Sequence, residues 1–229
     1  MSQVHAVKPF RDRVHAGQVL AEQLGRYANR PDVLVLALPR GGVPVAYEVA
    51  VALQVPMDVF LVRKLGVPGH EELAMGAVAS GGLRVLNDDV VHGLGVTEAV
   101  IDRVAEKEMI ELSRREREYR GDRPEPDPGG RIVILVDDGL ATGSTMRAAA
   151  QALATRQPAK IVVAVPLAAP ETCQALAREV DEVICAVTPQ PFYAVGLWYE
   201  DFDQTSDEAV RTLLAEARRD PIGTDRGKP

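Results

Sequence analysis

Apolar residues occur in short runs that alternate with longer stretches of helical periodicity. The run VLVLAL at 33–38 is apolar at every position, which is typical of a strand covered by helices on both faces. In sequence order, strands are expected at 33–38, 57–63, 131–136, 161–165 and 182–187, and helices at about 43–53, 97–119, 144–156, 171–178 and 206–219. This alternation predicts βαβ crossovers, so we expect an α/β fold with a mostly parallel central sheet flanked by helices.

The segment between the second and third expected strands, about 64–130, is interpreted as an insertion. KLGVPGH at 64–70 predicts an irregular, mobile loop, and 74–87 predicts a hairpin that turns at Gly81–Gly82. The stretch 122–130 is rich in Pro, Gly and acid and has the composition of a linker. Only two expected strands precede it, too few for a self-sufficient sheet, so a single domain is expected over residues 1–229.

Composition excludes several classes of function. The net charge of −7 disfavours nucleic acid as a partner. Cys173 and Cys185 are far from CxxC spacing, so neither a zinc site nor a disulfide framework is expected, and a reducing cytoplasm fits. Neither a signal peptide nor an apolar run of about 18 residues is visible, which predicts a cytoplasmic protein without membrane contact. The arginines at 114–117 alternate with glutamates and predict a solvated, ion-paired helix face.

The segment Val133–Thr145, VILVDDGLATGST, carries the most specific chemistry. A buried strand ends in two acids, and a turn rich in Gly and hydroxyl groups then opens a helix. Ligands of open α/β sheets bind at the carboxyl ends of strands, and a helix start offers free N–H groups to a phosphate, so 142–145 should hold a monophosphate. Asp137 and Asp138 would repel a phosphate but suit sugar hydroxyls, directly or through Mg²⁺. The alternative is a capped βα turn with solvated acids.

This segment resembles the signature with which type I phosphoribosyltransferases bind phosphoribosyl pyrophosphate (PRPP). It contains neither a Gly-Lys-Ser/Thr sequence nor a GxGxxG fingerprint, which disfavours ATP and dinucleotide binding. The resemblance implies a Rossmann-like type I phosphoribosyltransferase fold that has a small hood. It implies PRPP contacts at Asp137, Asp138, Ala141, Thr142, Gly143, Ser144 and Thr145.

Two further places resemble the family's pyrophosphate contacts. ALPRGGVP at 37–44 is similar to the pyrophosphate loop, with Arg40, Gly41 and Gly42 as contacts, and that loop often contains a non-proline cis peptide in the family. Its alternative is a tight turn with a surface arginine. Lys64, at the end of the second expected strand, is a candidate for another pyrophosphate contact, and its alternative is a basic strand end in water.

The remaining parts of the family site match less closely. The loop at 65–73, with one histidine and two glutamates, occupies the place of the family's lid. The hood is expected at 188–208, which holds half of the chain's aromatic residues. Phe192, Tyr193 and Trp198 are candidates for stacking on a base, and the alternative is a satellite hydrophobic cluster.

The resemblance implies a pentosyltransferase of nucleotide metabolism that moves the phosphoribosyl group of PRPP to a nitrogen acceptor such as a nucleobase. Asp137, Asp138, Arg40 and Lys64 would be the catalytic residues, and Mg²⁺, bound through PRPP, the cofactor. The alternative is a regulator of the same fold that binds PRPP without turnover. A homodimer is also expected, because family members often dimerise and the helix at 97–119 offers a contact.

Overall fold

The protein, seen in a computed structural model, is described for residues 10–219. Its helices are α1 (Arg13–Gln23), α2 (Gly42–Leu53), α3 (Asp88–Gly93), α4 (Glu98–Arg120), α5 (Ser144–Ala154), α6 (Pro170–Leu176) and α7 (Asp207–Arg219). Its strands are β1 (Val33–Ala37), β2 (Met57–Val59), β3 (Val62–Val67), β4 (His70–Ala79), β5 (Leu83–Leu86), β6 (Ile132–Val136), β7 (Lys160–Leu167) and β8 (Glu182–Val187). No helix within 10–219 has both the length and the apolar character needed to cross a bilayer.

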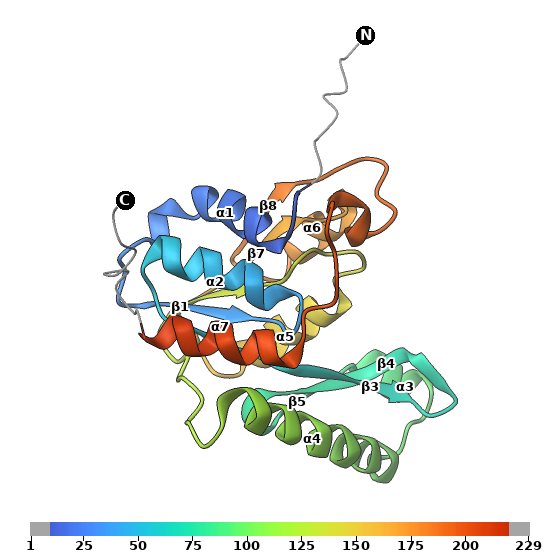
Figure 1. The fold of residues 1–229 in the computed structure, drawn as a ribbon. Coiled ribbons are helices and arrows are strands. Elements are labelled where there is room, and N and C mark those ends of the chain that lie inside the picture. Colours follow the sequence, from blue (N-terminus) through green and yellow to red (C-terminus); the bar gives the residue numbers. More distant parts are fainter. Residues whose placement is uncertain (1–9, 220–229) are drawn as a thin grey trace, which may run out of the picture.

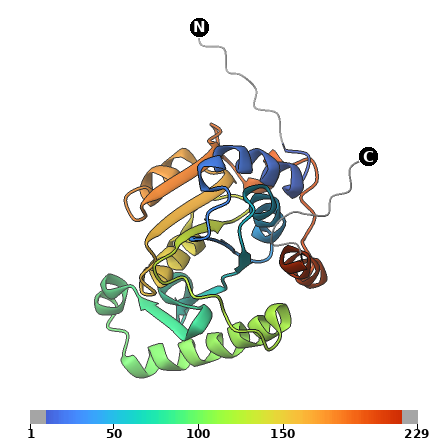
Figure 2. The ribbon, with the colours of Figure 1, turned by 90° about the vertical axis from the view of Figure 1, so that its left-hand side faces the viewer.

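The central sheet is parallel throughout, in the order β2-β1-β6-β7-β8. Alternate residues of each strand enter different cores because side chains of a strand point to opposite faces. In β1, Val33 and Val35 pack with α1, α2 and α7, whereas Leu34 and Leu36 pack with α5 and α6. The helices therefore form a layer on each face of the sheet (Figure 1, Figure 2), which confirms the predicted α/β class.

A second, antiparallel sheet, β3-β4-β5, lies beside the central one together with α3 and α4 (Figure 1, Figure 2). The prediction of one continuous strand over 57–63 is therefore wrong. The chain leaves the central sheet after Val59, passes through the buried residues Phe60 and Leu61, and starts the second sheet at Val62. The apolar run is continuous because the crossing between the sheets is itself buried.

The expected irregular loop at 64–70 is also wrong. Most of it is β-structure, in which β3 and β4 pair across a turn at Pro68 and Gly69. Gly69 has φ of 80°, a value that favours glycine, so the Pro-Gly pair forms a tight turn instead of interrupting the strands. The second hairpin was predicted correctly, because β4 pairs with β5 across Gly81 and Gly82.

Cysteine pairing differs from the expectation as well. Cys173 on α6 and Cys185 on β8 form a disulfide, although the sequence indicated none. The pair is 12 residues apart, and α6 returns directly onto β8, which brings both thiols to the same side of the sheet. The helix α1 was not predicted either; Asp12 caps it by accepting a hydrogen bond from the backbone N–H of His15 at 2.7 Å.

Candidate functional site

The two predicted phosphate-binding loops meet because their strands are neighbours. β1 pairs with β6 so that Ala37 lies opposite Val136, and both loops leave the same edge of the sheet. The backbones approach so closely that a Cβ on Gly42 would lie 2.7 Å from the carbonyl oxygen of Val136. The peptide bond between Pro39 and Arg40 is cis, as the resemblance to the pyrophosphate loop implied. The cis peptide and the glycines that follow it therefore lie beside the acidic pair.

The acidic pair is strongly perturbed by its surroundings. Burial, and then repulsion from Asp138, raises the pKa of Asp137 well above its ordinary value. Burial also raises the pKa of Asp138, and the nearby guanidinium of Arg13 offsets only part of that rise. Two carboxylates in so little water favour a ligand that supplies hydrogen-bond donors or positive charge.

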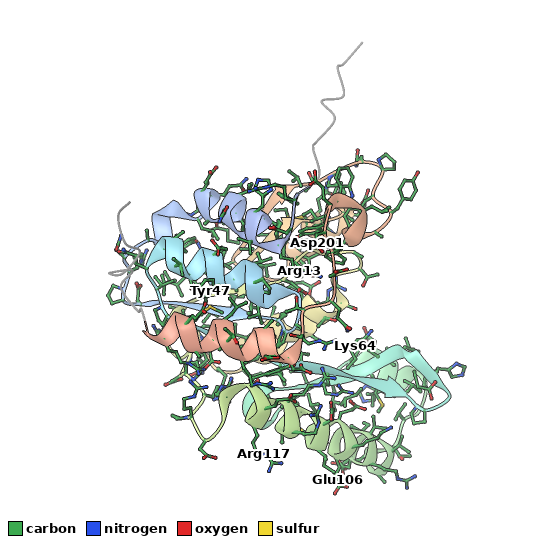
Figure 3. All side chains as sticks on the ribbon, in the orientation of Figure 1. Arg13, Tyr47, Lys64, Glu106, Arg117 and Asp201 are labelled. Carbon is green, nitrogen blue, oxygen red and sulfur yellow. A yellow bond between two sulfur atoms is a disulfide. The ribbon has the colours of Figure 1, made fainter. Side chains whose placement is uncertain are left out.

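Arg13 is a site residue that the sequence did not reveal. Its Nε donates to Oδ2 of Asp138 at 2.8 Å, and its Nη1 donates to the backbone oxygen of Asp203 at 2.7 Å. The guanidinium also lies 4.0 Å from the ring centre of Phe202. Figure 3 shows Arg13 reaching from α1 toward the segment that carries Asp201. Arg13 therefore connects α1, one of the paired acids and the predicted hood.

The turn after the acids is held by residues that follow β7. The start of α5, next along the chain, is left open. Leu140 pairs with Ala168 beyond β7, and the hydroxyl of Thr172 donates to the carbonyl oxygen of Ala141 at 2.5 Å. Gly143 then precedes α5 with φ of 69° and provides no side-chain cap. Ser144 begins the helix. Uncapped N–H groups and the positive end of the helix suit a phosphate at this place.

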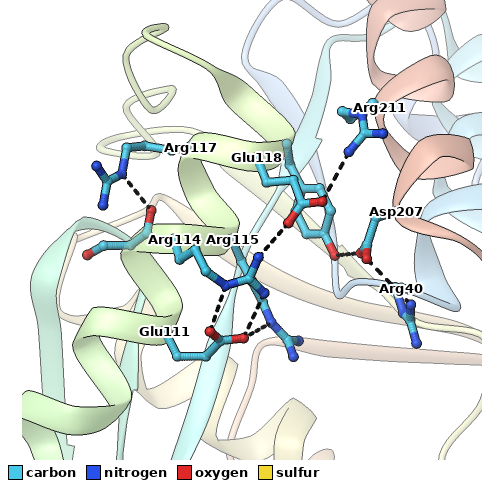
Figure 4. A network of polar contacts seen from close by, with 10 residues as sticks. Arg40, Glu111, Arg114, Arg115, Arg117, Glu118, Asp207 and Arg211 are labelled. Atoms are coloured by element: carbon cyan, nitrogen blue, oxygen red, sulfur yellow. Dashed lines mark hydrogen bonds and ion pairs between the residues drawn. The ribbon is translucent and has the colours of Figure 1, made fainter.

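The predicted pyrophosphate residues lie in two different environments. Arg40 is held loosely by Asp207, with 3.7 Å between Nη1 and Oδ2. Asp207 also accepts a hydrogen bond from the hydroxyl of Tyr119, so α7 and α4 both hold Arg40 near the loop (Figure 4). Lys64, in contrast, is exposed on β3, at the junction of the two sheets (Figure 3). Its role stays a prediction.

The predicted hood at 188–208 packs over the acidic turn. A Cβ on Gly139 would lie 2.6 Å from Val195, and the hydroxyl of Tyr199 donates to the backbone oxygen of Asp138 at 2.6 Å. Tyr199 is buried in a cluster with Phe10 that Phe192, Trp198 and Phe202 partly complete. Tyr193 is 78% exposed. Tyr199 therefore belongs to a satellite hydrophobic cluster, the alternative that the sequence left open for the hood. Base stacking by Phe192, Tyr193 and Trp198 stays a prediction.

The site's own carboxylates do not form a complete metal cage. Within residues 10–219, no group of three or more His, Cys, Asp or Glu side chains is arranged to hold a metal ion. The two half-buried acids are nevertheless hard oxygen ligands of the kind that Mg²⁺ uses together with substrate phosphates. They fit a cation that arrives bound to a phosphorylated ligand, whose oxygens would complete the coordination of the metal.

Comparisons with known proteins agree with this geometry. The family description "Phosphoribosyl transferase domain" matches residues 4–189, so the chain belongs to the phosphoribosyl transferase family. It is 48% identical over 214 residues to "Putative phosphoribosyl transferase Rv0571c" of Mycobacterium tuberculosis H37Rv, a match that covers 93% of this chain and 48% of the relative. The chain thus spans about half the length of the curated relatives it matches.

One solved structure is similar over nearly the whole fold. The crystal structure of TT1426 from Thermus thermophilus superimposes with a TM-score of 0.83 at 44% sequence identity. The match covers 91% of this chain and 98% of the Thermus chain. The type I phosphoribosyltransferase fold predicted from the signature is therefore confirmed.

Proposed function

We propose that the chain transfers the 5-phosphoribosyl group of PRPP to a nitrogen acceptor and releases pyrophosphate. The observation that carries the proposal is the meeting of two segments at adjacent strand ends. The Pro39–Gly42 loop, with its cis peptide, lies against the acidic pair that leads to the open start of α5. In this proposal the loop would hold the pyrophosphate, the acidic pair the ribose and the start of α5 the 5-phosphate, in the order in which PRPP connects these groups.

In the proposed reaction the bond between C1 of the ribose and the pyrophosphate oxygen breaks. The acceptor nitrogen forms a new bond to C1 and loses its proton to water. Arg40 and Lys64 would stabilise the charge of the departing pyrophosphate, and Asp137 and Asp138 would hold the ribose hydroxyls. Mg²⁺ bound through PRPP would neutralise charge on the pyrophosphate. The hood that packs over the acids would limit the access of water to C1.

The 5-phosphate would bind at the turn that opens α5. Ala141, Thr142, Gly143, Ser144 and Thr145 offer backbone N–H groups and hydroxyls for it. Arg13 would have to share Asp138 with the ribose or with Mg²⁺, since its Nε now occupies one carboxylate oxygen. Ligand binding is therefore expected to change the contacts of Arg13.

Calorimetric titration of PRPP, with and without Mg²⁺, tests the proposal. Mg²⁺-dependent binding by the wild type, lost in Asp137→Asn/Asp138→Asn, is the expected result. Gly25→Ala is a matched control, because a Cβ at Gly25 meets nothing within 4 Å. Equally weak binding by wild type and double variant would contradict the proposal.

A second measurement separates the enzyme from the regulator. PRPP and Mg²⁺ are incubated with nucleobases and other nitrogen acceptors, and released pyrophosphate is measured. Release that needs both Asp137 and Asp138 supports the transferase. Tight binding without release for any acceptor favours the PRPP-sensing regulator of the same fold. Cytoplasmic location and a homodimer also stay predictions, which fractionation and light scattering can test.

A further inference from the structure

A basic surface lies beside the start of α5, on the side that faces the β3–β4 hairpin. The α4 cavity, as we call it, has a volume of about 590 Å³. It is lined by Val62, Arg63, Lys64, Gly66, Pro68 and Glu71 of the hairpin, by Arg103, Val104, Lys107 and Glu108 of α4, and by Thr145 of α5. Four basic side chains therefore face two carboxylates in one concave space, in a chain whose net charge is −7.

Of the four basic side chains, one has an ion-pair partner among the side chains that the structure describes. Arg63 pairs with Glu108. Among residues 10–219, the ion pairs include neither Lys64 nor Arg103 nor Lys107 (all three exposed). Their positions on two facing elements bring three like charges to one cavity, where an anion would relieve their mutual repulsion.

The other half of α4 shows the opposite arrangement. Arg114 there pairs with Glu111 and Glu118 at 2.8 and 2.9 Å, and Arg115 shares Glu111 at 2.8 Å (Figure 4). The pairs lower the pKa of Glu111 to about 2, the hydrogen bond from Arg114 being the main cause. The same helix thus neutralises Arg114 and Arg115 in one half and leaves Arg103 and Lys107, one turn apart, beside a cavity in the other half.

The position of the cavity indicates what it binds. Thr145 belongs both to the cavity wall and to the first turn of α5, so the cavity begins where the proposed 5-phosphate place ends. The positive end of that helix adds to the field of the three cations. Lysine and arginine around an open space suit linked phosphate groups better than a single carboxylate, because linked phosphates carry several charges and acceptor oxygens.

We propose that the α4 cavity binds linked phosphate groups, and that Arg103 and Lys107 of α4 are ligand-binding residues. The site goes beyond the proposed transfer reaction, which uses neither of them. Two sources have this chemistry: the pyrophosphate group of PRPP itself, and a separate small molecule with a diphosphate. The site requires no turnover, so it stands or falls independently of the transfer reaction.

The test is a calorimetric titration with inorganic pyrophosphate, without Mg²⁺, on the full chain. Arg103→Gln/Lys107→Gln removes two cations from the cavity. Arg114→Gln/Arg117→Gln removes the same charge from the same helix and is the control. Both substitutions remove charge-assisted hydrogen bonds to the ligand, so pyrophosphate affinity should fall at least about tenfold in the cavity variant. The control should bind like the wild type.

Ribose 5-phosphate serves as a second probe for the phosphate place at α5. Its affinity should stay the same in the cavity variant, because neither substituted residue belongs to that place. A loss of affinity for both probes, or equal pyrophosphate affinity in cavity and control variants, would overturn the proposal. Thermal melting of both variants, expected to match the wild type because the residues are exposed, verifies that they fold.

A competition experiment identifies the source of the phosphates. Pyrophosphate and ADP are titrated into protein already saturated with PRPP and Mg²⁺. If PRPP blocks the cavity, then the cavity receives the pyrophosphate group of PRPP; if a ternary complex forms, it receives a separate diphosphate. If PRPP itself does not bind while pyrophosphate binding still depends on Arg103 and Lys107, the cavity is confirmed and the proposed transfer reaction fails.

Discussion

Replacing Arg13 with methionine should destabilise the protein and raise the pKa of Asp138 further. The two side chains are only 12% and 15% exposed, so their ion pair is shielded from water. Loss of one partner from a buried pair costs about 3–5 kcal/mol, and the contact with the Phe202 ring adds about 0.5–1 kcal/mol. Asp138 can escape part of this cost by taking up a proton, because burial already raises its pKa. We therefore expect a loss of about 2–4 kcal/mol in the free energy of unfolding near neutral pH.

A double-mutant cycle separates this pair from general packing. Urea unfolding is measured for Arg13→Met, Asp138→Asn and the double variant, with Arg114→Gln as a surface control. A coupling energy of at least about 1 kcal/mol is expected, because the two groups are in direct contact. The control should change stability by less than about 0.5 kcal/mol, as exposed pairs usually do. Additive effects of the two single substitutions would refute the reasoning.

Three further predictions concern the acids, the loop and the second sheet. The raised pKa of Asp137 means that the native state binds a proton more tightly than the unfolded chain, so wild-type stability should fall as pH rises from about 4 through the raised value. Asp137→Asn should reduce that fall, leaving the smaller contribution of Asp138, and should be the more stable protein at pH 7; parallel stability-against-pH curves of wild type and variant from pH 4 to 8 would argue against it. Gly41→Ala places a Cβ 2.0 Å from Oδ2 of Asp138, so calorimetry should show that PRPP binding is lost in this variant. The control Gly25→Ala should bind PRPP like the wild type. Arg120→Met leaves buried Asp58 with Arg218, at 3.5 Å, as its remaining ion-pair partner, and should cost about 3 kcal/mol in urea unfolding, the lower end for a broken buried pair; a change below about 1 kcal/mol would show that the Arg120–Asp58 pair does not fasten α4 to β2.

The parts of the fold that the sequence predicted well are those in which one local pattern has one structural solution. β1 and β6 are apolar at every position because helices cover both faces of the sheet, and these unbroken apolar runs predicted both strands. The acidic pair and the glycine-rich turn could be found together because they are contiguous. The cis peptide at Arg40 followed from family resemblance and from no pattern of hydrophobicity.

The parts that the sequence did not predict depend on contacts between distant positions. Arg13 lies 125 residues from Asp138 along the chain, so no spacing links them. The chain changes sheets at Phe60 and Leu61 inside an unbroken apolar run, because both residues are buried in the crossing. The pairing of Cys173 with Cys185 required the return of α6 onto β8, which the helix and strand predictions contained but did not place in space.

The strand order also has a consequence for how the protein is made. β1 and β6 are neighbours in the sheet, yet Val33 pairs with Ile132, so nearly half of the 229 residues are synthesised between the two halves of the site. Parallel pairings of such long range form slowly, because the entropy cost of closing a large loop precedes the favourable contacts between the strands. On the ribosome, the Pro39–Gly42 loop must wait without its partner until β6 emerges. A ligand that spans both loops would stabilise this late pairing, so PRPP is expected to promote the last step of folding as well as to occupy the finished site.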